Sequence, residues 1–225
     1  MIILSSGGFN DKLFSFCKGK ILNKFTEINS CIITTAAKTA ELKKKSEAGT
    51  REYLSNKNIR NIDIFDFEYD SNPEVLRNFN LIIINGGNPF NLMYYVKKSK
   101  AEKILLEFEK SDKIIVGISA GALLFSSGVH YIEEWYDIMD LPKSHGNVIG
   151  LRDMTGLLYK DLILFVHYDS WLKRNQNLEM KLQTIEKRDS ISILRLNNDV
   201  SIYFEEGKMI QIRCRYQKSP RINAD

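Results

Sequence analysis

The sequence has few cysteines, and their spacing matches no familiar cysteine site. Cys17, Cys31 and Cys214 lie far apart, form no CxxC pair and have no run of histidines near them. This pattern argues against a zinc knuckle and against a disulfide framework. It indicates a protein of the reducing cytoplasm, so we expect a cytoplasmic location.

Long apolar runs and strong charge are also missing. No stretch approaches the ~18 apolar residues needed to span a membrane, and the opening MIILSSGGFNDK lacks the basic region of a signal peptide. That opening predicts the first strand of the fold. The net charge of +4 is mild, with one cluster at Lys43-Lys44-Lys45 and no nucleic-acid recognition motif. We therefore expect neither membrane nor nucleic acid as a partner.

The composition is that of an ordinary globular protein, with 44% hydrophobic and 27% charged residues. A chain of 225 residues suits one domain, and no internal repeat or linker divides it. We expect residues 1–225 to form a single α/β hydrolytic domain whose polar tail frays from about residue 217.

Short apolar runs alternate with longer amphipathic segments along the first half of the chain. Several runs are continuously apolar, which indicates a sheet covered on both faces. The alternation predicts right-handed crossovers and a doubly wound, mainly parallel sheet flanked by helices. The predicted strands are residues 1–5, 31–36, 62–67, 81–85 and 114–118, and the predicted helices are residues 11–23, 40–55, 90–98, 101–110 and a segment from residue 120.

The pattern changes after Gly128. Residues 131–156 are irregular and predict excursions over the strand ends, whereas residues 162–166 predict a further strand and residues 178–188 a helix. A small antiparallel meander is expected to close the chain, with Glu206-Gly207 as a hairpin turn. Its predicted strands are residues 190–196, 199–204 and 209–214.

Polar features follow three of the predicted strands. They are Gly86-Gly87-Asn88, Ser119 and His167. Ligands of open α/β sheets bind at the carboxyl ends of the strands. We therefore expect these residues to meet at one edge of the sheet and to form the functional site.

Ser119 lies in a Gly117-x-Ser119-x-Gly121 pattern, which is typical of a nucleophile elbow. Small neighbours let the backbone close a sharp strand-to-helix turn, and the helix N-terminus stabilises negative charge. The alternative is a corner that is tight only for packing. The apolar strand before it and the helix after it are the context that the motif requires.

A nucleophilic serine needs a base to take its proton. The candidates are His130, His145 and His167, and His167 is preferred because it directly follows a buried strand. The alternative for His167 is a structural or solvated histidine.

The third member of such a triad should be a carboxylate that orients the imidazole. Glu133 and Glu134 lie between the serine and the preferred histidine, while Asp137, Asp140 and Asp169 compete with them. Residue chemistry alone does not rank these five.

The glycines at 86 and 87 would complete the site. They let the backbone approach a substrate closely. One N–H from this loop and that of Ala120 would form a two-donor oxyanion hole. The alternative is a plain turn into the next helix.

The blocks IINGGNPFNLMYYV, VGISAGALL and FVHYD resemble the peptidase E (aspartyl dipeptidase) family of serine peptidases. The resemblance extends from Met1 to about Cys214. It implies the class I glutamine amidotransferase-like fold, a flavodoxin-like three-layer sandwich. It also implies a triad of nucleophile Ser119, base His167 and acid Glu134, with Glu133 one position away.

The same resemblance implies the substrate contacts and the partner. Backbone groups of Gly87 and Ala120 would form the oxyanion hole. From their place at the strand end, we also expect Gly86 and Asn88 to contact a short peptide substrate. The implied reaction is peptide hydrolysis through an acyl-enzyme, which needs no metal and no organic cofactor. We expect a monomer or a homodimer.

Two features depart from the family. The family usually has aspartate where this chain has Glu134, and its aspartate-cleaving members have a longer loop after the histidine than HYDSWLKRNQN. Lys173 and Arg174 could meet an acidic side chain, but aspartyl specificity is not carried over. The alternatives are an esterase or other amide hydrolase on the same elbow, and a catalytically inactive ligand-binding relative.

Overall fold

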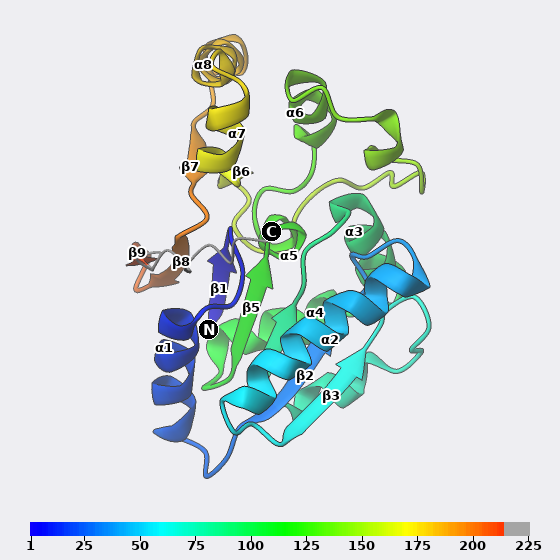
Figure 1. Cartoon of the computed structure of the whole chain (residues 1–225), viewed down its shortest axis with the longest axis vertical. Coiled ribbons are helices and arrows are strands. Elements are labelled where there is room, and N and C mark those ends of the chain that lie inside the picture. Colours follow the sequence, from blue (N-terminus) through cyan, green and yellow to red (C-terminus); the bar gives the residue numbers. More distant parts are fainter. Residues whose placement is uncertain (214–225) are drawn as a thin grey trace, which may run out of the picture.

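Five parallel strands form the larger part of a seven-stranded sheet with the order β3-β2-β4-β5-β1-β8-β9 (Figure 1). The structure is a computed structural model and describes residues 1–213, so the expectations for Cys214 and for the tail from residue 217 lie outside the described residues. The strands of this sheet are β1 (Ile2–Ser5), β2 (Asn29–Ile33), β3 (Asn61–Phe65), β4 (Leu81–Ile84), β5 (Ile114–Ile118), β8 (Val200–Glu205) and β9 (Lys208–Arg213).

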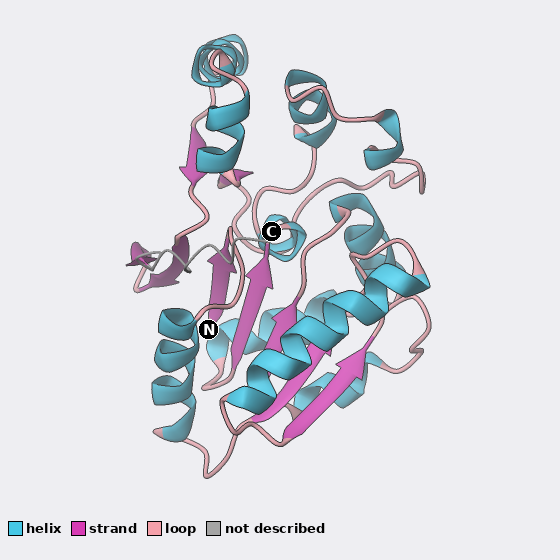
Figure 2. Cartoon of the chain, in the orientation of Figure 1, coloured by secondary structure: helices cyan, strands magenta, loops and turns pink. Residues whose placement is uncertain are grey.

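Both faces of the sheet are buried, as the continuously apolar strands predict. In β4, Ile82 and Ile84 belong to one hydrophobic core, whereas Ile83 belongs to the other. The α1 and α2 helices cover the second core, and α3, α4 and α5 pack on the first (Figure 2). The helices are α1 (Asp11–Leu22), α2 (Ala40–Asn56), α3 (Pro89–Lys98), α4 (Glu102–Glu107) and α5 (Ala120–Phe125), with 3₁₀ helices η1 (Pro73–Asn78) and η2 (Phe108–Lys110).

Local sequence explains where the longer helices begin. The side chains of Asn10, Thr39 and Asn88 each accept a hydrogen bond from the backbone N–H three residues later, which satisfies an otherwise unpaired donor of the first turn. Pro89 follows Asn88 at the first position of α3. A proline has no backbone N–H, but at this position the N–H would have no partner within the helix, so no hydrogen bond is lost.

The C-terminal part of the chain contains a second, two-stranded sheet that the sequence does not predict. Strands β6 (Ile163–Val166) and β7 (Ile193–Leu196) pair in parallel, separate from the main sheet (Figure 2). The prediction that residues 190–196 belong to an antiparallel meander is therefore wrong. The helices α7 (Tyr168–Arg174) and α8 (Leu178–Asp189) form a crossover between the two strands, which brings β7 back parallel to β6.

Ser6 connects the small sheet to the end of β1. Its hydroxyl accepts a hydrogen bond from the N–H of His167 (2.7 Å) and donates one to the carbonyl of Leu196 (3.0 Å). The carboxyl ends of β6 and β7 therefore lie beside the carboxyl end of β1, although β6 and β7 do not pair with the main sheet.

The predicted α/β class, with a mainly parallel sheet and an antiparallel C-terminal pair, is confirmed. The β8–β9 hairpin turns at Glu206 and Gly207, which have φ values of 49° and 74°. Two successive residues with positive φ are typical of a type I′ turn. The irregular segment after α5 also contains α6 (Ile132–Ile138) and the 3₁₀ turn η3 (Lys143–His145).

Cys17 and Cys31 are buried, one in each of the two cores. Burial raises the pKa of both thiols well above its usual range, so they remain protonated and act as small apolar side chains. None of the helices within residues 1–213 is both long and apolar enough to cross a membrane.

Candidate active site

Ser119 lies at a sharp turn between β5 and α5. Its φ of 53° and ψ of −106° place a non-glycine residue in a strained part of backbone space. The Ser119 N–H donates to the carbonyl of Ser5 (2.9 Å), and the Ser119 carbonyl accepts from the N–H of Leu123 (3.1 Å). Sheet and helix thus hold the strained residue on both sides.

The glycines on either side of Ser119 are required by close backbone approaches. A Cβ atom on Gly117 would lie 2.4 Å from the carbonyl oxygen of Gly121. A Cβ atom on Gly121 would lie 2.5 Å from the carbonyl oxygen of Ile84 in the neighbouring strand. The Gly-x-Ser-x-Gly spacing therefore has a direct steric cause.

His167 reaches Ser119 from the small sheet. It follows β6 directly, has a left-handed φ of 58°, and places Nε2 2.8 Å from Oγ of Ser119. This is hydrogen-bond distance for a base that takes the hydroxyl proton. The predicted pair is thus brought together, while His130 and His145 make no contact with Ser119 among the described hydrogen bonds.

The partner of His167 on its other ring nitrogen is Asn198. Nδ1 of His167 lies 2.6 Å from Oδ1 of Asn198. An amide oxygen can only accept, so the proton lies on Nδ1 and leaves Nε2 free to accept from Ser119. Asn198 itself is fixed, because its Nδ2 donates to Oγ of Ser170 (2.6 Å) and its N–H to Oδ1 of Asp169 (2.9 Å).

Gly7 allows Asn198 to come this close. A Cβ atom on Gly7 would lie 2.1 Å from the backbone oxygen of Asn198. The loop after β1 and the loop after β7 therefore touch through their backbones.

Glu134, predicted as the triad acid, does not contact His167. Both of its carboxylate oxygens accept hydrogen bonds from the guanidinium of Arg188, at 2.7 and 2.9 Å. Glu133 accepts instead from the N–H of Asn147 (3.0 Å). Glu134 lies on α6 and turns toward α8, whereas the position beside Nδ1 is filled by Asn198. The prediction of Glu134 is corrected on this geometry.

The other acidic candidates also lie away from the imidazole. Asp137 and Asp140 are exposed on and just after α6. Asp169 acts only indirectly on the imidazole. Its carboxylate accepts a hydrogen bond from the backbone N–H of Asn198 and so helps to hold the residue that contacts His167.

Substituting Glu134→Gln is expected to leave kcat/KM for peptide hydrolysis unchanged. The substitution removes one charge from an exposed ion pair. The guanidinium of Arg188 keeps its other ion pair, with the carboxylate of Asp189 at 2.7 Å. Exposed pairs of this kind contribute about 0–1 kcal/mol to the free energy of unfolding. Steady-state kinetics and thermal unfolding measure both quantities, and a large loss of activity would restore Glu134 as a triad candidate.

Gly86 and Gly87 bring the backbone close to Ser119. Gly87 has a φ of 147°, and a Cβ atom there would lie 2.4 Å from the carbonyl oxygen of Ala36. A Cβ atom on Gly86 would lie 3.1 Å from Cβ of Ser119. Among the described residues, the N–H groups of Gly87 and Ala120 have no backbone acceptor, so both can donate to an oxyanion.

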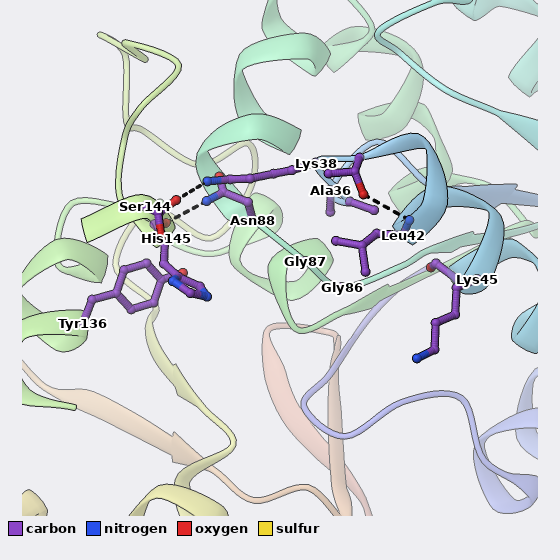
Figure 3. A pocket seen from close by; sticks show the side chains of 13 residues that line it. Ala36, Lys38, Leu42, Lys45, Gly86, Gly87, Asn88, Tyr136, Ser144 and His145 are labelled. Atoms are coloured by element: carbon purple, nitrogen blue, oxygen red, sulfur yellow. Dashed lines mark hydrogen bonds between the residues drawn. The ribbon is translucent and has the colours of Figure 1, made fainter. Parts of the chain in front are cut away.

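Asn88 lines the larger hollow beside the glycine loop and also positions two neighbouring segments. Its Oδ1 caps α3 by accepting from the N–H of Asn91 (2.8 Å), and its Nδ2 donates to the carbonyl of His145 (2.7 Å). The second bond holds the η3 turn over the glycine loop (Figure 3).

Two hollows open from the glycine loop. One, of about 170 Å³, contacts Ser119, Ala120, Gly87 and His167 and is otherwise lined mainly by apolar side chains. The other, of about 660 Å³, lies between the glycine loop, the start of α2 and the η3 turn (Figure 3). Its walls include Lys45, whereas Lys38 points across it to the carbonyl of Ser144.

The site contains no metal-binding arrangement within residues 1–213. No group of three or more histidine, cysteine, aspartate or glutamate side chains there is placed to hold a metal ion. The described polar groups at Ser119 instead form a linear hydrogen-bonded chain from hydroxyl to imidazole to amide.

Comparison with known proteins finds similarity to peptidases over most of the chain. The sequence pattern of peptidase family S51 matches residues 1–212. An uncharacterized peptidase of Listeria innocua is 27% identical over 188 residues, which covers 75% of this chain and 85% of that protein. Another from Listeria monocytogenes is 29% identical over 154 residues, covering 65% and 72%.

Two solved structures share the fold. A peptidase E protein from Listeria monocytogenes superposes with a TM-score of 0.66 at 22% identity, covering 94% of this chain and 97% of that one. A peptidase from an acI-B1 Actinobacterium gives a TM-score of 0.63 at 16% identity, with coverages of 96% and 94%.

Proposed function

Because the chain belongs to peptidase family S51 and is therefore a serine-type hydrolase, we propose that it hydrolyses short peptides through Ser119, His167 and Asn198. The observation that carries this proposal is the chain of two hydrogen bonds, 2.8 Å from Ser119 to His167 and 2.6 Å from His167 to Asn198. The proposed nucleophile and base are those expected from the sequence, and the orienting residue is an asparagine.

In the acylation step, Oγ of Ser119 attacks the scissile carbonyl carbon while Nε2 of His167 takes the hydroxyl proton. The carbonyl oxygen becomes an oxyanion that accepts from the N–H groups of Gly87 and Ala120. The imidazolium then gives its proton to the leaving amine. The carbon–nitrogen bond breaks, and the acyl group stays on Ser119 as an ester.

In the deacylation step, a water molecule takes the place of the amine. His167 removes a proton from this water, the hydroxide attacks the ester, and the proton returns to Oγ of Ser119. Asn198 carries no charge, so its contribution is to hold the imidazole in the correct tautomer and orientation in both steps. The larger hollow beside Gly86 gives the rest of a short peptide room to lie.

A fluorophosphonate probe tests whether Ser119 is activated. The unaltered protein is expected to take up one equivalent, because the serine oxygen displaces fluoride from phosphorus and His167 accepts the proton. Ser119→Ala is expected to take up none, while Ser111→Ala, a matched change at the end of η2, is labelled normally. Intact protein mass spectrometry counts the label.

The same measurement separates the rival assignments. Labelling that persists in Ser119→Ala would contradict the proposal by showing that another residue is the activated nucleophile. No labelling of the unaltered protein would contradict it as well and would favour a ligand-binding protein without hydrolytic activity. An esterase would also be labelled, so hydrolysis of dipeptides by the unaltered protein distinguishes a peptidase from an esterase.

A further inference from the structure

The smaller hollow beside Ser119 has the features of a pocket for one substrate side chain. Four of its lining residues carry the groups proposed to react, namely Gly87, Ser119, Ala120 and His167. Its other walls are formed mainly by apolar and aromatic side chains. They include Leu123, Ile132, Trp135, Met139, Phe165 and Trp171.

The charge of this hollow is unsuitable for an acidic side chain. None of its lining residues is a lysine or an arginine within the part of the chain that the structure describes. Lys173 and Arg174 are exposed on α7 and do not line it, and the guanidinium of Arg174 lies over the ring of Trp171, 5.3 Å from its centroid. A carboxylate placed inside would lose its hydration and would meet no lysine or arginine there. The polar side-chain groups of the other lining residues include the imidazoles of His145 and His167, the hydroxyls of Ser119 and Tyr136 and the ring N–H of Trp135.

The size of the hollow suits a leucine or phenylalanine side chain. Its volume is about 170 Å³, and cavities of about 150 Å³ with similar apolar walls accept benzene. Trp135 and Phe165 meet edge to face at 5.0 Å, so two packed rings fix part of the wall in advance of binding. A preformed apolar wall favours an apolar group of matching volume.

We propose that this hollow binds the side chain of the residue whose carbonyl is attacked, and that this residue is apolar and as large as leucine or phenylalanine. The inference rests on the proposed function. In the proposed reaction the attacked carbonyl carbon would lie next to Oγ of Ser119, with its oxygen between the N–H groups of Gly87 and Ala120, and all three residues line the hollow. The side chain on the adjoining carbon is the substrate group that can enter it.

A series of aminoacyl 4-nitroanilides tests the proposal on the unaltered protein. Phenylalanine, leucine, alanine and aspartate derivatives share one leaving group, so differences in kcat/KM report the acyl side chain alone. One methylene in an apolar pocket changes kcat/KM by about 10- to 200-fold. We expect the phenylalanine and leucine compounds to exceed alanine by roughly 100-fold or more, with aspartate the slowest.

Filling the hollow provides a second test. Leu141 lines it and is half-buried, so Leu141→Trp should occupy the space and lower kcat/KM for the phenylalanine compound more than for alanine. Leu22→Trp is the matched control, because Leu22 is exposed at the end of α1 and lines none of the described hollows. Equal losses for both substrates would overturn the assignment of the hollow.

Fluorophosphonate labelling keeps the two proposals distinguishable. If Ser119 is labelled but the protein prefers the aspartate compound, or cleaves the alanine compound as fast as the phenylalanine one, the proposed function stands and the assignment of the hollow is contradicted. If the protein is not labelled, both proposals are contradicted. The substrate series needs no variant, so its result holds even where Leu141→Trp folds poorly.

Discussion

Replacing Asn198 with leucine is expected to lower kcat for peptide hydrolysis by roughly 10³-fold. Leucine has a similar shape but no acceptor for the proton on Nδ1 of His167, which Asn198 now holds at 2.6 Å. Without that acceptor, the imidazole populates the wrong tautomer and turns away from Ser119. The loss should fall on kcat and leave KM nearly unchanged, because Asn198 lines neither hollow beside the glycine loop.

The control for this experiment is Asn198→Asp. An aspartate oxygen accepts the same hydrogen bond and adds a charge that stabilises the imidazolium, so most of the activity should remain. Thermal unfolding of both variants separates lost catalysis from lost folding. If Asn198→Leu hydrolyses peptides at the rate of the unaltered protein, Asn198 does not position His167.

Replacing Gly121 with alanine is expected to lower the free energy of unfolding by about 2 kcal/mol. In an exposed helix this change would be favourable by about 1 kcal/mol, because alanine is the better helix former. Here the new methyl group would lie 2.5 Å from the carbonyl oxygen of Ile84 and 3.1 Å from its Cβ. A backbone oxygen cannot rotate away, so α5 must shift, and overpacking of this kind costs about 1–3 kcal/mol or more.

The same substitution at Gly49 is expected to change the stability of the protein in the opposite direction. Gly49 lies inside α2, and a Cβ atom there would meet nothing within 4 Å. Its unfolding temperature should rise slightly, while that of Gly121→Ala should fall by roughly 4–8 °C for a chain of this size. Calorimetry measures both, and equal shifts would show that the elbow tolerates a larger residue.

The parallel sheet and the elbow could be predicted from the sequence because local patterns determine them. Continuous runs such as residues 81–84 predict strands buried on both faces, and β4 is indeed divided between the two cores. The glycines around Ser119 are required by contacts within a few residues or with the adjacent strand. Local constraints of this kind require particular residue types at fixed positions, so they can be recognised in the sequence.

Asn198 could not be found in this way because its role depends on the pairing of β6 with β7. Only three residues separate β7 from β8, a spacing that favours a hairpin in the sequence. Val166 lies opposite Leu196 in the parallel pair. The residues that follow the two strands therefore lie side by side. The available signal was the Asn197-Asn198 pair directly after a strand, but the partner strand had to be known first.

The division of the site between two sheets has a consequence for how activity can be lost. Ser119 and the glycine loop belong to the main sheet, whereas His167 and Asn198 follow strands of the small one. The two sheets meet at the hydroxyl of Ser6 and in one hydrophobic core that both contribute to. Local opening of a protein can separate such a part while the rest stays folded. An opening that detaches β6 and β7 would therefore remove the base from Ser119 even where the hydrogen bonds of the main sheet remain.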